Sequence, residues 1–385
     1  MKKHIKLILI ICLLFSSQVK SQSDISFNSK GYIQGMEMFW FNNGEVQTMS
    51  TLSNRLDFEA FIGYSFTAQL SMRNILNFGE MPKLYYPFMA DAAITDQGRM
   101  DMTYSLASDS SYFAYSQFDR AFIKYTEGNL EISVGRQRIN WGINMVWTPN
   151  DIFNSFNYLD FDYAERAGSD AALIQYYTGP ASSIQFAYKL DHLNRATYAL
   201  MYKFNTLNYD FQIMSGKLDR DLVIGGGWSG QIGSAGFLGE FTYFHSPKDH
   251  ISDFHSLVAS VSLNYTFKNN VFTQTSILYN SAGTNENAGR GNFMASNRPV
   301  SAKDYTLAKW ALFGQISFPL SPLISADFSG IFNPGDNSSY LGPSFNFSVA
   351  ENFDLMFVGQ FFMGSNGSEY GDYGTMLFTR LRWSF

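Results

Sequence analysis

The sequence predicts an all-β protein, a transmembrane antiparallel β-barrel of about 18 strands. Three observations predict it. Aromatic residues make up 17% of the 385 residues against 16% charged residues, and 31 glycines supply turns. Segments of about 9–11 residues with alternating apolar and polar side chains follow one another, which is the length that a tilted spanning strand needs. Connections between these segments are alternately short and long, as in barrels with short periplasmic turns and long external loops.

The N-terminus predicts a signal peptide at residues 1–21, followed by a barrel at residues 22–385. An apolar run from Leu7 to Phe15 follows a basic start and ends before the small residue Ser21, and it is too short to span a bilayer. Cleavage after Ser21 would remove Cys12, the single cysteine, and four lysines, Lys2, Lys3, Lys6 and Lys20. Loss of the cysteine argues against disulfides and thiol catalysis. The remaining 23 basic and 33 acidic residues make an acidic chain, which argues against a nucleic-acid partner.

We expect strands near residues 31–42, 53–62, 65–76, 117–126, 130–141, 169–178, 182–190, 197–205, 208–217, 221–232, 236–246, 254–267, 271–281, 307–318, 323–333, 338–349, 353–363 and 374–385. The long connections, 77–116, 143–168 and 282–306, all fall on one side, predicted to be external. Pro343 conflicts with its strand because proline lacks the N–H of the ladder, so we expect a bulge there or a later start.

The last segment, "GTMLFTRLRWSF", alternates apolar residues with arginines and ends on Phe385. It resembles the terminal strand of Gram-negative outer-membrane barrels. The resemblance implies recognition by the barrel-insertion machinery, a place in the outer membrane and contact with outer-membrane lipid.

The stretch "VGRQRINWG" raises the question of which way its arginines point. Strict alternation from Val134 would direct Arg136 and Arg138 into lipid, where each arginine costs about 2–4 kcal/mol. We therefore predict a bulge at Gly135 that turns both arginines inward and leaves Ile139 and Trp141 facing out. Together with the other basic residues of neighbouring strands, the predicted pore-lining set is Arg55, Arg73, Arg120, Lys124, Arg136, Arg138, Arg380 and Arg382.

Such a cationic wall would attract anions, because rings of Arg and Lys set anion preference in pores. Acids of the external loop, namely Asp151, Asp160, Asp162 and Glu165, would form a constriction if they folded inward opposite the arginines. The alternative is structural: the carboxylates of Glu37, Asp57, Glu59 and Glu131 would pair with the cations and stiffen the wall.

The run "VGRQRINWGINMVWTPNDIF" resembles a segment of poorly characterised outer-membrane porin-like families distantly similar to alginate-export porins. The matching positions are Gly135, Arg136, Gln137, Trp141, Gly142, Asn144, Pro149 and Asp151. The resemblance implies an 18-stranded pore with a basic interior suited to acidic polymers or small anions. The composition, rich in Asn, Tyr and Phe, is similar to that of Bacteroidetes proteins.

Three classes of function stay open. The first is a porin-like channel for passive passage of small or polymeric anionic hydrophilic solutes, without a cofactor and without enzymatic activity. The second is a scaffold or assembly partner whose lumen is plugged by loops, for which the segment 77–116 is long enough. The third is an outer-membrane hydrolase. The stretch "HSPKDHISDFH" gathers His245, His250 and His255, but its spacing does not predict a metal site. A homo-oligomer is compatible with the sequence.

Overall fold

The computed structural model describes residues 25–162, 168–246, 255–289 and 300–385. The predicted signal peptide, the loop acid Glu165 and His250 lie outside the described residues.

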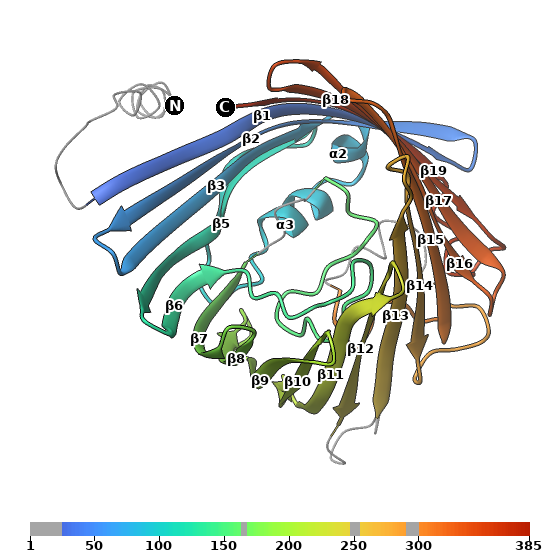
Figure 1. Cartoon of the computed structure of the whole chain (residues 1–385). Helices are drawn as coiled ribbons and strands as arrows, with labels where there is room; N and C mark the ends of the chain where they lie inside the picture. The colour runs from blue at the N-terminus through green and yellow to red at the C-terminus, as the bar shows by residue number, and fades with distance from the viewer. Residues whose placement is uncertain (1–24, 163–167, 247–254, 290–299) are drawn as a thin grey trace.

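In the described residues, nineteen strands form one antiparallel sheet. They are β1 (Ile25–Asn42), β2 (Glu45–Ile62), β3 (Phe66–Phe78), β4 (Thr103–Asp109), β5 (Tyr112–Glu127), β6 (Leu130–Gln137), β7 (Ser169–Gly179), β8 (Ser182–Leu190), β9 (Ala196–Thr206), β10 (Tyr209–Leu218), β11 (Asp221–Ile232), β12 (Ala235–His245), β13 (Ser256–Thr266), β14 (Phe272–Asn280), β15 (Trp310–Ser321), β16 (Ile324–Asn333), β17 (Ser338–Ala350), β18 (Phe353–Met363) and β19 (Thr375–Ser384). Because β1 pairs with both β2 and β19, the sheet closes (Figure 1). β3 pairs directly with β5, so 18 strands form the ring and β4 lies outside it. The predicted fold class is confirmed.

The two faces of the barrel differ in the way the alternation predicts. In β13, Val258, Ser260 and Ser262 are 1–2% exposed, whereas Val261 and Leu263 on the opposite face are 38% and 44% exposed. Successive side chains of a strand point to opposite faces, so the first set points into the barrel and the second set points out. Apolar residues therefore cover the outer surface, and small polar residues line the inside.

The long connections all lie at one end of the barrel, whereas short turns occur at both ends. Two-residue turns such as Asn43–Gly44 and Leu207–Asn208 have positive φ at both positions, which matches the twist of tight hairpins. The short connections near residues 63–65, 127–129, 179–182 and 350–352 lie at the end of the barrel where β19 finishes. The three long connections, after β3, β6 and β14, all leave the opposite end, as predicted.

The strand predicted at 130–141 is shorter than expected. β6 ends at Gln137, and the predicted bulge at Gly135 is wrong, because both pairings of β6 keep their register through this residue. Gly135 instead adopts φ +125°, and a Cβ there would lie 2.2 Å from the carbonyl oxygen of Ala121. A register shift instead occurs in the neighbouring strand β5, in its pairing with β3. Asp119 is the extra residue of β5 there, opposite Ser71 and Met72.

Ile139 and Trp141 do not face outward. Each is 1% exposed, because the chain leaves the wall after Gln137 and folds into the lumen. The alternation rule fails here since it applies only while the chain remains in a strand.

Pro343 lies in the interior of β17, so the predicted bulge or later start is also wrong. Pairing with β16 continues through Pro343, whereas pairing with β18 skips Gly342 and Pro343 and resumes at Ser344 in the same register. The side of the strand that lacks an N–H therefore faces β18, and the ladder tolerates a local interruption.

The segment between β3 and β5 contains structure that the sequence did not predict. Two short helices, α2 (Glu80–Leu84) and α3 (Phe88–Ile94), lie within the ring of strands (Figure 1), and Met81 is 1% exposed. β4 then pairs with residues 112–117 of β5, whereas β6 pairs only with residues 121–127. β4 thus occupies the place beside β5 beyond the end of β6.

Candidate functional site in the barrel lumen

The segment 138–162, which we call the inner loop, runs around the inside of the barrel. Its contacts follow the strands in order. Trp141 donates a hydrogen bond to Gln185 of β8 and accepts one at its carbonyl oxygen from Gln212 of β10. Farther on, the rings of Trp147 and Tyr158 pack edge-on against Phe313 of β15, and Phe161 packs against Phe378 of β19. A continuous chain segment therefore narrows the lumen from within.

The inner loop rests against two different surfaces. We call the first the cationic wall; it consists of the inward arginines of β19, β2, β3, β5 and β6: Arg55, Arg73, Arg120, Arg136, Arg380 and Arg382. We call the second the neutral wall; it consists of inward side chains of β10 to β14: Gln212, Met214, Val223, Thr242, Ser260, Ser262, Gln274 and Ser276. Glu240 of β12 is an acidic side chain within the neutral wall.

Arg55 lies at the centre of the cationic wall and is 2% exposed. Its guanidinium donates to both carboxylate oxygens of Asp119, with Nη2 3.0 Å from Oδ1, and its Nε donates to Asp57 at 3.0 Å. The side chain of Asp119 is 1% exposed. The extra residue in β5 thus supplies the carboxylate that neutralises a buried arginine.

Arg136 is held in a comparable way. Its Nε donates to Asp170 at 2.8 Å, its Nη1 donates to Asp96 at 2.7 Å, and its Nη2 donates to the carbonyl oxygen of Met100 at 2.6 Å. Burial by itself would raise the pKa of Asp96, but the hydrogen bonds from Arg136 and from the N–H groups of Gly98 and Met102 hold that pKa below its ordinary value. Arg136 therefore ties β6, β7 and the segment before β4 together.

A third cluster forms around Asp162, at the end of the inner loop. Its carboxylate accepts hydrogen bonds from Arg73 at 2.9 Å, Gln34 at 3.0 Å and Arg380 at 3.4 Å. Arg382 is adjacent, donating from Nε to Gln34 Oε1 at 2.8 Å. The Asp162 carboxylate thus faces the arginines.

Arg382 differs from Arg55, Arg73, Arg136 and Arg380, which each pair with a carboxylate. Besides Gln34 it contacts the ring of Tyr32, whose centroid lies 4.2 Å from the guanidinium carbon, and its Nη2 is buried without a hydrogen-bond partner. Within the described residues, the two side chains that contact Arg382 in this way, Gln34 and Tyr32, are both neutral. Its charge is therefore not balanced by a carboxylate in direct contact.

The other predicted residues lie apart from these clusters. Arg120 donates to the carbonyl oxygen of Asp119 at 2.7 Å, and the described part of the chain gives Lys124 no ion pair. Arg138 begins the inner loop, half-buried, with an Nε that has no hydrogen-bond partner. Of the loop acids, Asp160 is exposed, whereas Asp151 is fully buried.

Asp151 lies in the middle of the inner loop, whereas Asp162 is at its end. Burial raises its pKa from 3.8 to about 6, against the opposing effect of the N–H of Asn154 and the charges of Arg138 and Lys189. One of its oxygens, Oδ2, has no hydrogen-bond partner. The structure therefore does not bring Asp151 and Asp162 together into one acidic constriction.

With this geometry in view, the chain can be compared with known proteins. No protein-family model matches the sequence, and no curated protein is significantly similar to it. Solved structures do match. The outer membrane protein OprD of Pseudomonas aeruginosa aligns with a TM-score of 0.60 at 9% identity, over 96% of this chain and 96% of that one. This chain has an OprD-like barrel fold.

Two further structures support the same conclusion. OccD3 (OpdP) of P. aeruginosa aligns with a TM-score of 0.55 at 10% identity over 93% of this chain and 91% of that chain. OccAB4 of Acinetobacter baumannii aligns with a TM-score of 0.56 at 9% identity over 96% and 100%. At such identities the likeness shows the fold alone. The resemblance to alginate-export porins and to Bacteroidetes proteins stays a prediction.

Several residues of this OprD-like barrel that contact the inner loop or the arginines were not predicted from the sequence. Asp96, Asp119, Gln34 and Glu240 are four of them. The alternation in "FLGEFTYF" carried a signal for Glu240, because Phe241 and Tyr243 point outward and place Glu240 and Thr242 inside. For Asp96 there was no such signal, because it lies on a connection.

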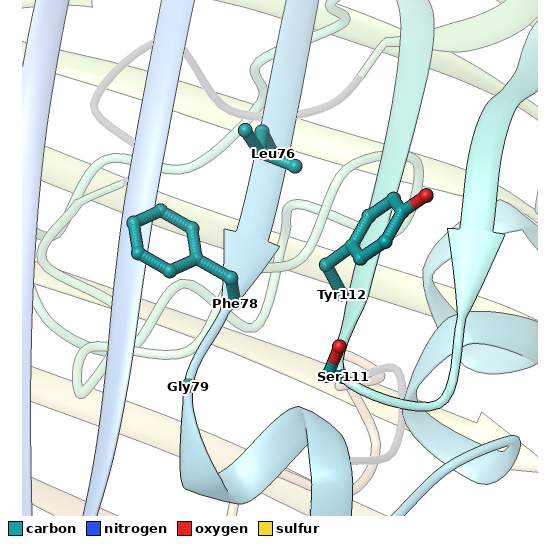
Figure 2. A pocket seen from close by; sticks show the side chains of 5 residues that line it. All are labelled: Leu76, Phe78, Gly79, Ser111 and Tyr112. Carbon is teal, nitrogen blue, oxygen red and sulfur yellow. The ribbon is translucent and has the colours of Figure 1, made fainter.

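A shallow hollow occurs on the outer surface between β3 and β5. Figure 2 shows Leu76, Phe78 and Tyr112 around it, with Gly79 and Ser111 at its edge. Leu76 and Phe78 alternate with the buried residues Ile75 and Asn77, so the hollow faces away from the lumen. Its lining carries no charged group, and it is separate from the arginine clusters.

The described residues also bear on the metal and membrane-helix alternatives. Among them, no group of three or more His, Cys, Asp or Glu side chains is placed to hold a metal ion. The rings of His245 and His255 stack with centroids 4.6 Å apart. No helix in the described part of the chain is long and apolar enough to cross a bilayer.

Proposed function

We propose that this chain is an outer-membrane channel for passive passage of small anionic hydrophilic solutes. The apolar outer surface and the OprD-like fold support a place in the outer membrane, reached through the predicted signal peptide. The inner loop leaves a narrowed lumen, which favours small solutes over polymers.

The observation that carries the anion preference is the environment of Arg382. Its guanidinium contacts the amide of Gln34 and the ring of Tyr32, and Arg380 and Arg73 lie on the same carboxylate next to it. A cation without a carboxylate in direct contact, in a lumen of low dielectric constant, raises the local concentration of anions. By contrast, Arg55 and Arg136 are each neutralised by two carboxylates and support the structural alternative for their part of the wall.

Reversal potentials in planar bilayers under a salt gradient test this proposal. The wild-type barrel should show anion preference, and an Arg380→Gln, Arg382→Gln double variant should lose most of it, since two inward charges are removed. Lys268→Gln is the matched control, because it removes the same kind of charge from an exposed turn and should leave the reversal potential unchanged. Cation preference in the wild type, or an unchanged reversal potential in the double variant, would contradict the proposal.

A second candidate is a plugged barrel that acts as a scaffold for another envelope protein. The observation that favours it is the apolar packing inside the ring, where Met81 of α2 and Trp141 and Phe153 of the inner loop are 1–2% exposed. A barrel of this kind would insert into bilayers but carry no current in the wild type or in any of the charge variants. The same measurement therefore separates the two functions.

A further inference from the structure

We propose that Glu240 is the positioning residue that fixes the inner loop against the neutral wall and thereby sets the width of the lumen. The inference about channel width rests on the proposed function. The inference about the loop position does not, and it can be tested separately.

Glu240 is an isolated carboxylate in a neutral environment. It is 1% exposed, and its cross-strand neighbours in β11 and β13 are Gly227 and Ser260. In the part of the chain that the structure describes, no ion pair involves Glu240. A carboxylate in such a place is costly unless hydrogen-bond donors surround it.

The donors come from the inner loop. Glu240 Oε1 accepts hydrogen bonds from the backbone N–H groups of Ile143 at 3.1 Å and Asn144 at 2.8 Å, and Oε2 accepts one from the N–H of Asn150 at 3.0 Å. One side chain thus satisfies three backbone donors on both sides of the bend between residues 143 and 150. Each of these hydrogen bonds offsets part of the cost of burying the polar carboxyl group.

The strand next to Glu240 is shaped to receive the loop. In the "GGG" run of β11, a Cβ on Gly227 would lie 2.7 Å from Cδ1 of Ile143, and a Cβ on Gly225 would lie 2.8 Å from Oδ1 of Asn150. Side chains at these positions would push the loop away from the wall. The glycines and Glu240 therefore form one surface against which residues 143–150 pack.

Side-chain contacts of the loop complete the attachment. Asn144 Nδ2 donates to the carbonyl oxygen of Ser260 at 3.0 Å, and Asn150 Nδ2 donates to that of Gly226 at 3.0 Å. Thr242 Oγ1 donates to Asn150 Oδ1 at 2.7 Å. These contacts depend on the loop being at the height of Glu240, so loss of the carboxylate should weaken all of them together.

Glu240→Ala should release the loop from the wall. We expect single-channel conductance to rise by roughly twofold or more, because a released loop no longer holds a fixed constriction. The rate of amide hydrogen exchange at Ile143, Asn144 and Asn150 should increase by about tenfold or more. Glu240→Gln retains one acceptor oxygen and the shape of the side chain; it should show the same changes to a smaller extent, and it keeps the test available if the alanine variant does not fold.

Gln274→Ala is the matched control. Gln274 also points inward from the neutral wall and is 2% exposed, but both of its amide atoms lack a hydrogen-bond partner in the described residues. Its replacement should change neither the conductance nor the exchange of the three loop amides. A change as large as that of Glu240→Ala would show a general response of the wall and would overturn the proposal.

A cross-link distinguishes loop position from barrel distortion. The side chains of Asn150 and Thr242 are in contact, so Asn150→Cys with Thr242→Cys in the Glu240→Ala background should form a disulfide that returns the loop to the wall. Conductance should fall to the wild-type value when the pair is oxidised and rise again on reduction. If the disulfide forms but the conductance is the same in the oxidised and the reduced protein, the change in conductance cannot be assigned to the loop.

The amide exchange separates this proposal from the proposed function. If the wild-type barrel carries no current, the channel proposal fails, but accelerated exchange in Glu240→Ala and not in Gln274→Ala still supports Glu240 as the positioning residue. Unchanged exchange at the three amides would overturn that role whatever the conductance.

Discussion

The cationic wall and the neutral wall hold the same inner loop by different means. On the cationic wall, Asp162 is bound by the side chains of Arg73 and Arg380, so charge on the loop meets charge on the wall. On the neutral wall, the backbone of the loop donates to Glu240, and apolar loop residues such as Trp141 and Phe153 belong to the same buried apolar cluster as Met214 and Val223 of that wall. An ion pair therefore specifies a partner side chain, whereas backbone donors around one carboxyl group specify the position of a whole segment.

The largest expected effect tests whether the cationic wall depends on its pairing. Arg55→Ala removes the guanidinium that donates to both carboxylate oxygens of Asp119, whose side chain is 1% exposed. We expect a loss of about 3–5 kcal/mol in the free energy of unfolding, measured by urea titration of the barrel in lipid vesicles. Lys124→Ala is the control, because no ion pair involves it in the described residues, and it should cost much less. Equal effects of the two substitutions would mean that pairing does not stabilise this wall.

A second prediction concerns the acid that the inner loop keeps apart from the arginine cluster. The pKa of Asp151 is raised by burial to about 6, so the folded state binds a proton more tightly than the unfolded state. This contribution to stability is fully present below about pH 4 and is lost as the pH rises to about 6, a fall of about 3 kcal/mol at 1.4 kcal/mol per pKa unit. Urea unfolding at pH 4 and pH 7 measures it. Asp151→Asn should remove this part of the pH dependence, whereas identical pH profiles would contradict the buried, raised carboxyl.

The smallest expected effect sharpens the contrast between paired charges inside and outside the lumen. Arg195 pairs with Asp191 at 2.7 Å in the connection between β8 and β9, but its side chain is 48% exposed. Water screens such a pair, so Arg195→Ala should lower the free energy of unfolding by only about 0–1 kcal/mol in the same urea titration. A loss as large as that of Arg55→Ala would show that burial does not govern the strength of these ion pairs.

The strands of the barrel could be predicted because the signal for them is local. In β13 the alternation of Ser260 and Ser262 with Val261 and Leu263 predicts which side chains face the lumen and which face outward. The short turns predict where each strand ends. The inward direction of Arg55 and Arg73 follows from the same rule, and both are buried in the structure. The register of each pairing was also largely determined, because a shift by one residue would exchange the two faces.

The inner loop could not be predicted in this way. Trp141 has the same local sequence whether it faces lipid or the lumen, and its position depends on Gln185 and Gln212, which are distant in the chain. The bulge was placed at Gly135 because a phase change was required near Arg136, but the structure solves the problem by ending β6 at Gln137. Such choices depend on contacts between remote segments, which periodicity does not encode.

The closed barrel with an apolar outside and inward arginines could be predicted from the amino-acid sequence, since side-chain alternation in a strand is a local geometric property. Which of those arginines are neutralised and which carry charge into the lumen depends on long-range contacts in the folded chain. This dependence arises because carboxylates such as Asp96, Asp119 and Asp162 reach the wall from a connection, an inserted strand residue and the inner loop. Their final positions are set by the packing of segments that lie far apart in the chain.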